Sequence, residues 1–285
     1  ETDFDLLLAR HATREQARFF LERRGQSLET LEFQHNVFQE VLSVARSTVP
    51  DGWRQAHVLR HSLDRFLFTP EDVVIAVGQD GLVANLAKYL DGQPVIGINP
   101  AESLYDGVLT RYPVNALDKL MQASVSGSAG FERRTMVEAV LENGERLRAL
   151  NEIFVGHRSH QSARYRIETG ERQEEQSSSG LIVATGTGAT GWARSIMEAS
   201  HVRLPLDPLK PSVGFFVREP FPSLRTGTDI RSGQIKPSNK LIVTSHMNEG
   251  GVIFADGLES DFISFDWGRV VSLRPAEQTL NLVHE

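Results

Sequence analysis

The stretch Ser179–Trp192, with the sequence SGLIVATGTGATGW, constrains this chain more than any other. It opens with the apolar run Leu181–Ala184, whose length and composition are typical of a buried strand. Three glycines follow in the spacing G-x-G-x-x-G, and residues 192–198 can form a helix. Glycines let the backbone approach phosphate groups, and the free N–H groups at a helix start favour negative charge. This stretch therefore predicts a nucleotide site.

Taken alone, the glycine spacing indicates the dinucleotide site of an NAD(P)-dependent oxidoreductase. That fingerprint belongs in a first βαβ unit, with an acidic residue about 20 residues further on at the end of the next parallel strand. Here the loop lies past the middle of the chain, and Asp207 stands between Leu206 and Pro208, where no central strand ends. Another kind of nucleotide site is favoured, with the oxidoreductase and a glycine turn without a ligand as alternatives.

Composition excludes several classes of function. The 285 residues carry a net charge of −7, which gives no general affinity for nucleic acid, and no apolar run approaches the roughly 18 residues of a membrane span. The chain has no cysteine, so thiol nucleophiles and thiolate metal sites are excluded. Residues 1–5 lack the basic end of a signal peptide, so we expect a cytoplasmic protein, or one of the mitochondrial matrix if the source is eukaryotic.

The N-terminal segment predicts a short strand followed by helices. Residues 5–9 form an apolar run that we interpret as a strand. Thr13 with Gln16 has the form of a capping box that opens a helix, and Ser27 is placed to start a second one. Further short strands are expected at residues 57–59 and 66–68.

Two buried strands in the first half predict a parallel sheet. Residues 73–77 and 94–99 are continuous apolar runs, and residues 82–90 between them have a helical pattern. Ligands bind such sheets at the carboxyl ends of the strands, where the segment 78–81 stands. The carboxylate of Asp80 in that segment can accept a proton from an attacking hydroxyl or hold Mg²⁺ beside a triphosphate, the alternative being an ordinary Asp-Gly turn.

From about residue 125 the pattern becomes β-rich. We therefore expect an α/β domain with a parallel sheet over residues 1–124 and a β-rich, β-sandwich-like domain over residues 125–285. The strands expected in the second domain are 136–141, 146–155, 163–169, 181–185, 213–217, 241–245, 252–255, 262–265, 270–273 and 280–283.

Two polar segments interrupt this pattern. Asn151-Glu152 interrupts the strand expected at 146–155 just before the apolar run 153–155, and burying such a pair without partners costs free energy. The pair therefore either occupies an exposed edge position or contacts a ligand. The acidic run 171–175 is expected to be a solvated hairpin tip.

The order of these motifs resembles the NAD kinase family, from about residue 70 to the end. The features that carry the resemblance are Gly78-Gln79-Asp80-Gly81, then residues 94–99, then Asn151-Glu152, then Ser179-Gly180-Leu181 leading into residues 185–190. The mitochondrial-type branch is the most similar, because Thr185-Gly186-Thr187-Gly188 replaces Thr-Pro-Thr-Gly and Trp192 replaces a tyrosine. Residues 217–220 and Asp256-Gly257 also resemble that branch.

The resemblance implies an NAD kinase/diacylglycerol kinase-like fold and a phosphotransferase activity. Members of this family transfer the γ-phosphoryl group of ATP to the 2′-hydroxyl of the adenosine ribose of NAD, which gives NADP. Mg²⁺ would bind with the nucleotide and not through protein ligands alone. The resemblance also implies a homodimer or higher homo-oligomer, with the last residues packed back on the first domain.

The resemblance also implies roles for individual residues. Asp80 would be the catalytic carboxylate at the ribose hydroxyl. The phosphates of ATP would meet Gly78, Gln79 and Gly81. The NAD-binding residues would be Asn151, Glu152, Thr185, Gly186, Thr187, Gly188, Thr190, Trp192 and Ser195.

Two departures from the family pattern leave alternatives open. Gln79 stands where the family has a second glycine, and a side chain there obstructs the loop if bare backbone must meet phosphate. Ser179 stands where the family usually has an acid. The alternatives are a non-catalytic nucleotide-binding relative of the same fold and a divergent kinase that acts on another nucleotide or a lipid.

Overall fold

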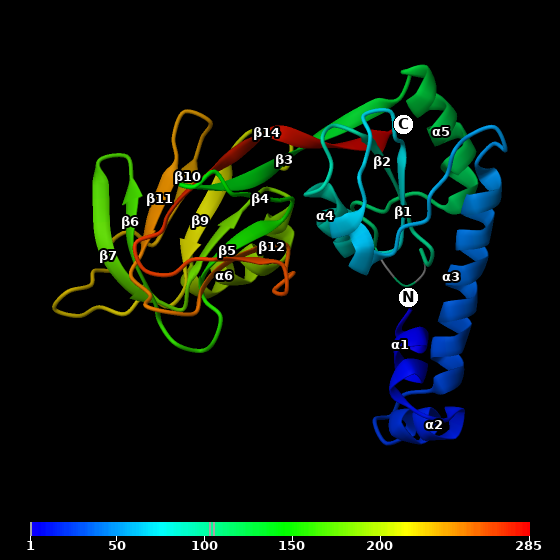
Figure 1. The fold of residues 1–285 in the computed structure, drawn as a ribbon, viewed down its shortest axis with the longest axis horizontal. Coiled ribbons are helices and arrows are strands. Elements are labelled where there is room, and N and C mark those ends of the chain that lie inside the picture. The colour runs from blue at the N-terminus through cyan, green and yellow to red at the C-terminus, as the bar shows by residue number, and fades with distance from the viewer. Residues whose placement is uncertain (1, 103, 105) are drawn as a thin grey trace. The chain divides into compact units, whose positions relative to one another are not determined.

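The fold is that of a computed structural model, which describes residues 2–102, 104 and 106–285 (Figure 1). The chain forms two compact units. The first comprises Glu1–Val83, Pro94–Gly130 and Val283–Glu285, and the second comprises Ala84–Gln93 and Phe131–Leu282. The units thus change over near residue 130, and the last three residues belong with the first unit.

The first unit opens with three helices, α1 (Asp3–Arg10), α2 (Arg14–Glu22) and α3 (Leu28–Thr48). Each begins at a hydroxyl residue that accepts a hydrogen bond from a backbone N–H in the first turn: Thr2, Thr13 and Ser27. The helix starts predicted at Thr13 and Ser27 are confirmed. The strand predicted at residues 5–9 is wrong, because Thr2 and Asp5 form a reciprocal capping box that starts a helix there.

A parallel pair of strands forms the centre of the first unit. β1 (Val74–Val77) pairs in parallel with β2 (Pro94–Ile98), which confirms the predicted parallel sheet. Helix α4 (Asp80–Ala87) follows β1, and η2 (Val114–Ala116) and α5 (Leu117–Ser126) follow β2. The buried residues of this layer are Ala45, Ile96, Ile98, Leu117, Leu120, Met121 and Val283.

The strands predicted at residues 57–59 and 66–68 are wrong. The chain there forms the 3₁₀ helix η1 (Arg60–Arg65) between segments of irregular backbone. Short apolar runs do not distinguish strands from other buried segments, and neither run gains a neighbouring strand in the structure.

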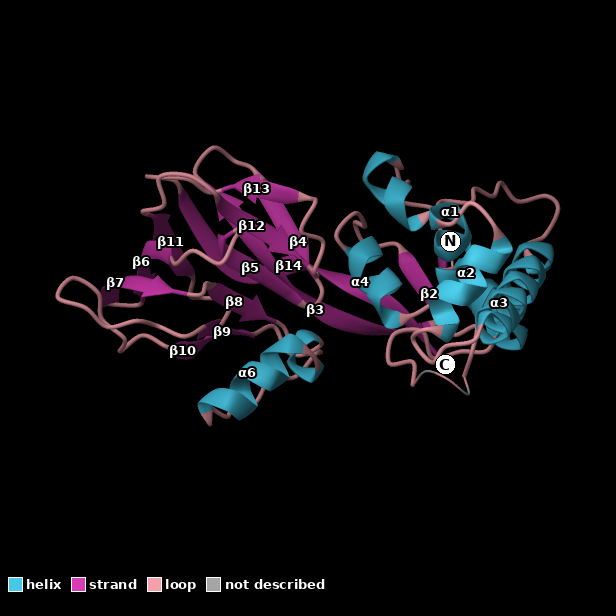
Figure 2. Cartoon of the chain, turned by 90° about the horizontal axis from the view of Figure 1, so that it is seen from below, coloured by secondary structure: helices cyan, strands magenta, loops and turns pink. Residues whose placement is uncertain are grey.

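The second unit consists mainly of two antiparallel sheets (Figure 2). In one sheet the order is β14–β11–β6–β7, with β3 paired to both β14 and β4; in the other it is β10–β9–β8–β5–β12–β13. The strands are β3 (Gly130–Leu141), β4 (Arg146–Ala149), β5 (Glu152–His157), β6 (Ala163–Thr169), β7 (Arg172–Ser178), β8 (Leu181–Ala184), β9 (Val213–Val217), β10 (Ser232–Ile235), β11 (Leu241–Ser245), β12 (Gly251–Ala255), β13 (Phe262–Ser264) and β14 (Val270–His284).

Three details of the predicted β-rich pattern are wrong. The single strand predicted at 146–155 is two strands, because the backbone turns at Leu150-Asn151. The acidic run 171–175 lies mostly within β7, which pairs with β6, so the hairpin tip is at Gly170. The segments 270–273 and 280–283 belong to the single strand β14.

Helix α6 (Trp192–Ser200) packs on the outer face of the second sheet. Its buried Ala193 meets apolar residues of β5, β8, β9 and β12. The η3 turn (Gly188–Thr190) joins β8 to α6, so the glycine loop lies where the sheet and this helix meet. Among the helices that the structure describes, none is long and apolar enough to cross a membrane.

Candidate functional site

The first predicted loop, residues 78–81, lines a groove of about 350 Å³. Gly78, Gln79 and Gly81 contribute to its wall, together with residues of α1 and α3 and the segments 58–60 and 100–101. The volume lies in the range of about 300–1,000 Å³ that is usual for small-molecule sites. A Cβ added at Gly81 meets no atom within 4 Å, so the backbone is open there. The structure thus brings the three predicted phosphate-binding residues together, and Gln79 lines the groove without closing it.

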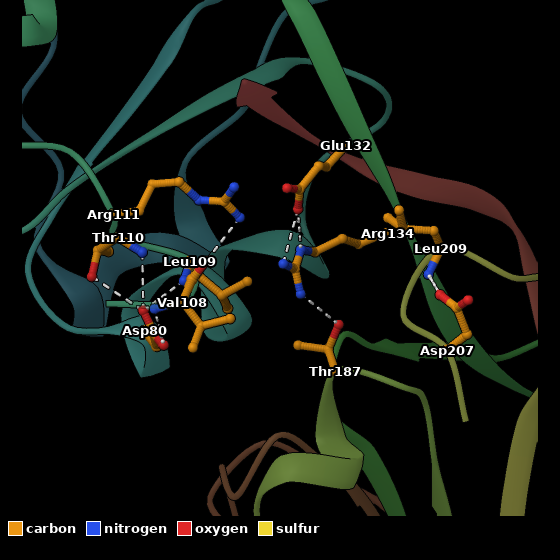
Figure 3. Close-up of polar contacts among 10 residues, drawn as sticks. All are labelled: Asp80, Val108, Leu109, Thr110, Arg111, Glu132, Arg134, Thr187, Asp207 and Leu209. Carbon is orange, nitrogen blue, oxygen red and sulfur yellow. Dashed lines mark hydrogen bonds and ion pairs between the residues drawn. The ribbon is translucent and has the colours of Figure 1, made fainter. Parts of the chain in front are cut away.

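Asp80 is the first residue of α4, and its carboxylate binds the backbone of the segment 108–110 (Figure 3). Oδ2 accepts the N–H of Val108 at 3.0 Å, and Oδ1 accepts the N–H groups of Leu109 and Thr110, both at 2.9 Å. The Thr110 hydroxyl adds a contact of 3.2 Å to Oδ1. The carboxylate therefore holds this segment next to the start of α4. Its predicted catalytic role stays a prediction.

The second predicted loop follows β8, which pairs antiparallel with both β5 and β9. A Rossmann site needs a parallel βαβ unit around its glycine loop, so the oxidoreductase alternative is excluded. The strand–loop–helix order predicted for Ser179–Trp192 is nevertheless present, as β8, η3 and α6.

The hydroxyl of Thr185 organises this loop from inside. It donates to the carbonyl of Leu150 at 2.5 Å and accepts the N–H groups of Thr187 and Gly188 at 3.1 and 3.2 Å. The next N–H groups also bond within the loop, Ala189 to the Thr185 carbonyl and Gly191 to the Gly188 carbonyl. The loop therefore uses these four N–H groups itself, whereas the role expected for the N–H groups at the start of α6 stays a prediction.

The glycines of this loop are required by close backbone packing. A Cβ at Gly186 would lie 2.2 Å from the carbonyl carbon of Asp207, and a Cβ at Gly188 would lie 2.2 Å from the carbonyl oxygen of Asn151. Neither backbone atom can move aside as a flexible side chain can. Glycine is needed at both positions because the loop presses against these two segments.

The predicted NAD-binding side chains differ in exposure. Thr187 is buried, whereas Thr190 and Ser195 are exposed on the turn and on α6. Trp192 stacks on Phe154 with ring centroids 6.1 Å apart and an angle of 12° between the planes. The guanidinium of Arg218 also contacts this ring and lies 5.1 Å from its centroid. The Trp192 ring thus contacts both an aromatic residue and a cation.

Asn151 and Glu152 lie against the same loop. The carbonyl of Asn151 accepts the N–H of Thr185 at 2.9 Å, and Glu152 is opposite Ala184 in the β5–β8 pair. The structure therefore brings the polar pair and the glycine loop together, although more than 30 residues separate them in the sequence. Of the two interpretations of the polar pair, an exposed edge position is excluded because β5 lies between β8 and β12.

Asp256, which the sequence offered only as part of an Asp-Gly pair, fixes the polar pair in place. Its carboxylate accepts the N–H groups of Leu150, Asn151 and Glu152 at 3.0, 2.7 and 3.3 Å. Its own N–H donates to the Glu152 carbonyl at 3.0 Å. Asp256 adopts a left-handed conformation with φ of 51°, which Asp tolerates better than most residues. The carboxylate thus caps the start of β5.

Burial raises the pKa of both carboxyl groups. The pKa of Glu152 rises to about 7, first because the group is desolvated and then because Asp256 is close. The pKa of Asp256 rises to about 6 by desolvation, against the opposing effect of its three N–H donors. The pair therefore gains protons between pH 6 and 7, where ordinary carboxyl groups are ionised.

We expect Glu152→Gln to flatten the pH dependence of stability. The pKa of Glu152 is about 7 in the folded chain against an ordinary 4.5, so the folded state binds more protons between these values. The contribution to the free energy of unfolding is therefore complete below about pH 4.5 and is lost as the pH rises through 7. The amide variant should be more stable than wild type at pH 8 by about 2 kcal/mol and nearly equal to it at pH 5. Denaturant unfolding at both pH values measures this, and equal differences at pH 5 and 8 would contradict it.

Arg134 is a second site residue that the sequence does not reveal. Its side chain is 7% exposed and lies on β3, where Nη2 is 2.9 Å from Oε2 of Glu132. Its Nη1 donates to the Thr187 hydroxyl at 3.3 Å (Figure 3). A single arginine in an alternating strand carries no distinguishing signal, so only the fold places this buried cation beside the glycine loop.

A protein metal centre is not formed by the residues that the structure describes, among which no three His, Asp or Glu side chains gather at ligating distance.

Several NAD kinases are similar to this chain in sequence. The chain matches no protein-family model. It is 26% identical over 222 residues to the NAD kinase of Chlorobaculum tepidum, covering 74% of this chain and 71% of the relative. It is 33% identical over 132 residues to that of Burkholderia pseudomallei and 35% identical over 133 residues to that of Methylococcus capsulatus. The last two matches cover 44% of this chain and span 43% and 44% of the relatives.

Two solved structures share the fold. Yeast NADH kinase complexed with NADH superposes with a TM-score of 0.57 at 19% identity, covering 76% of this chain and 64% of that one. The NAD kinase from Archaeoglobus fulgidus in complex with ATP superposes with a TM-score of 0.56 at 22% identity, covering 75% and 78%. The predicted α/β plus β-rich fold is confirmed, whereas the mitochondrial-type branch stays a prediction. The sequence relatives and the shared fold together support a member of the NAD kinase family.

Proposed function

We propose that this protein transfers the γ-phosphoryl group of ATP to the 2′-hydroxyl of the adenosine ribose of NAD, giving NADP and ADP. The observation that carries the proposal is the assembly of Asn151-Glu152 on the Thr185–Gly188 loop, with Asp256 capping the pair. Two motifs that are distant in the sequence thus form one polar surface, as recognition of a dinucleotide requires. The relatives named NAD kinase point to the same reaction.

Some of the residues proposed for NAD binding would contact NAD, and others would hold the loop in its conformation. The hydroxyl of Thr185 already has three backbone partners, two in the loop and one at Leu150, and Gly186 and Gly188 pack against backbone. These three residues are proposed to act by fixing the loop. The side chains proposed to contact NAD are Asn151, Glu152, Thr187, Thr190, Trp192 and Ser195. A protonated Glu152 can donate as well as accept a hydrogen bond, which suits a ribose hydroxyl or an amide.

The phosphoryl donor is proposed to bind at the Gly78–Gly81 loop. The open backbone at Gly81 and the start of α4 offer N–H groups and a favourable dipole to the phosphates. Mg²⁺ bound to the donor would neutralise part of the charge, as in other phosphoryl transfers, and needs few protein ligands. The archaeal relative was solved with ATP, which supports this choice of donor.

In the reaction, the 2′-oxygen of the ribose attacks the γ-phosphorus, and the bond from that phosphorus to the bridging oxygen of ADP breaks. The hydroxyl proton passes to the carboxylate of Asp80, which is the role implied by the family resemblance. Oδ2 of Asp80 accepts one hydrogen bond from the protein, so it retains capacity for a second.

The direct test measures NADP formed from NAD, ATP and Mg²⁺, with a dehydrogenase that responds to NADP alone. We expect NADP and ADP to appear in equal amounts. The alternative is a nucleotide-binding protein without turnover, which the side chain of Gln79 in the donor loop favours. Stabilisation of the fold by NAD, with no NADP formed from ATP, GTP or polyphosphate, would establish that alternative and overturn the proposal.

A further inference from the structure

The groove at the Gly78–Gly81 loop is lined in part by residues from outside that loop. Besides residues of the loop, it is lined by Gln34, His35 and Phe38 of α3 and by Thr2 and Asp3 at the start of α1. The family resemblance begins only near residue 70, so these side chains are outside the recognised motifs. They include an aromatic ring, an amide and an imidazole, which are the groups that bind flat heterocycles with polar edges.

His35 is held by α1 through one ring nitrogen. Nδ1 lies 2.7 Å from the hydroxyl oxygen of Thr2 and 3.5 Å from Oδ1 of Asp5. The Phe4 ring packs on the imidazole with centroids 5.1 Å apart. The His35 side chain is 18% exposed, so the ring is mostly enclosed by these contacts while still lining the groove.

The same contacts assign the proton of the ring. The Thr2 hydroxyl donates its single hydrogen to Oδ2 of Asp5 at 3.1 Å and accepts the N–H of Asp5 at 3.3 Å. With its hydrogen on Oδ2, the hydroxyl accepts from Nδ1 of His35, and the nearby carboxylate of Asp5 also favours a proton on Nδ1. In the neutral ring Nε2 then carries a lone pair. Nε2 has no polar partner among the residues that the structure describes.

The lining carries the charged side chains of Asp3 and Arg60, and these with the start of α4 indicate how a nucleotide would lie. Asp3 places a carboxylate at the α1 end, where phosphates would be repelled. At the loop end, the carboxylate of Asp80 is turned to the backbone of 108–110, and the start of α4 favours anions. Phosphates therefore belong at the loop end and the base at the end formed by α1 and α3. Phe38 of α3 supplies apolar surface there.

We propose that this groove binds the nucleobase of the phosphoryl donor and that Nε2 of His35 accepts a hydrogen bond from the exocyclic amino group of adenine. The inference rests on the proposed function for the identity of the donor. It adds a specificity residue and a role for the N-terminal helices. Helix α1 positions His35 through Thr2, Phe4 and Asp5.

If Nε2 of His35 accepts from the amino group of adenine, the protein should bind ATP more tightly than inosine triphosphate. Inosine triphosphate carries a carbonyl oxygen where ATP carries the amino group, so an acceptor would face the lone pair of Nε2. We expect wild type to bind ATP about ten-fold more tightly than inosine triphosphate, a modest ratio because the groove is open to water. His35→Ala should lose this preference by weakening ATP about ten-fold, with little change for inosine triphosphate. Calorimetric titration of the full chain with each Mg²⁺–nucleotide measures all four affinities.

Three controls separate recognition from damage to the fold. Inorganic tripolyphosphate occupies only the phosphate end, so its affinity should be the same in wild type and His35→Ala. His35→Gln retains an acceptor oxygen at a similar reach and should recover part of the preference for ATP. His160→Ala, an exposed histidine of the second unit, should change nothing.

The outcomes also distinguish this inference from the proposed function. Equal affinities of wild type for ATP and inosine triphosphate, or an unchanged preference in His35→Ala, would overturn the inference even if NADP is formed. A preference for ATP that disappears in His35→Ala would uphold it even if no NADP is formed. In that case the groove is a purine nucleotide site and the phosphoryl transfer is what fails.

Discussion

Replacing Asp80 by asparagine is expected to lower the rate of NADP formation at least about 100-fold, which is the usual contribution of a positioned proton acceptor. The variant keeps the size of the side chain but removes the charge that takes the proton of the ribose hydroxyl. In wild type both carboxylate oxygens accept backbone N–H groups of the segment 108–110. The NH₂ group of asparagine would therefore face one of these N–H donors, with which it cannot form a hydrogen bond. The rate is measured with saturating NAD and ATP.

The structure requires a control for this experiment, because Asp80 has two roles. A loss of activity by displacement of the segment 108–110 would lower the thermal midpoint of unfolding and weaken substrate binding as well. Thr110→Val is the matched variant, since it removes only the hydroxyl contact of 3.2 Å and leaves the carboxylate charged. A catalytic role predicts a large fall in kcat for Asp80→Asn alone, with KM for NAD within a few-fold of wild type. Activity near that of wild type in Asp80→Asn would contradict the catalytic role.

The sequence predicts those parts of the fold that local chemistry determines. Local sequence patterns predict the hydroxyl caps at Thr13 and Ser27 and the apolar strands β1 and β2. Each of these features depends on neighbours within a few residues. The error at residues 5–9 arises where two local signals compete. An apolar run of this length fits a strand or a helix, and the capping box of Thr2 and Asp5 decides for the helix.

What the sequence does not show depends on contacts between distant segments. The strands predicted at 270–273 and 280–283 are one strand, because β14 runs from Val270 to His284 through Pro275. The break between β4 and β5 follows from Asp256, which binds the backbone of residues 150–152 from about 100 residues further along the chain. No pattern in either segment alone indicates that pairing.

The same distinction applies to the candidate site. The spacing predicts the Gly186–Gly191 loop and the helix that follows it. In the structure the Thr185 hydroxyl accepts the N–H groups of Thr187 and Gly188, and Gly186 and Gly188 are explained by packing on Asp207 and Asn151. These two glycines therefore serve close packing, and the binding of NAD by the loop stays a prediction. Arg134 and the α1–His35 contacts had no sequence signal, because single polar residues acquire meaning only beside their partners.

The packing of Gly188 leads to the second large effect. Gly188→Ala would place a methyl group 2.2 Å from the carbonyl oxygen of Asn151, 2.6 Å from its carbon and 2.9 Å from its Cα. All three atoms belong to backbone, and the same carbonyl accepts the N–H of Thr185 at 2.9 Å. The loop must therefore move away from β5, which breaks that hydrogen bond and disturbs the contacts of the Thr185 hydroxyl. We expect destabilisation of about 3 kcal/mol, at the upper end for overpacking.

For a chain of this size, such a loss corresponds to a fall of roughly 6–12 °C in the thermal midpoint of unfolding. NAD binding should weaken more than stability alone explains, because the displaced loop carries Thr187, Thr190 and Trp192 away from Asn151 and Glu152. Gly52→Ala is the control, since a Cβ there meets no atom within 4 Å and the midpoint should be unchanged. Thermal unfolding with and without NAD measures both effects. If Gly188→Ala kept the midpoint and the NAD affinity of wild type, the loop would not be seated on Asn151, and the dinucleotide site proposed from that contact would have to be abandoned.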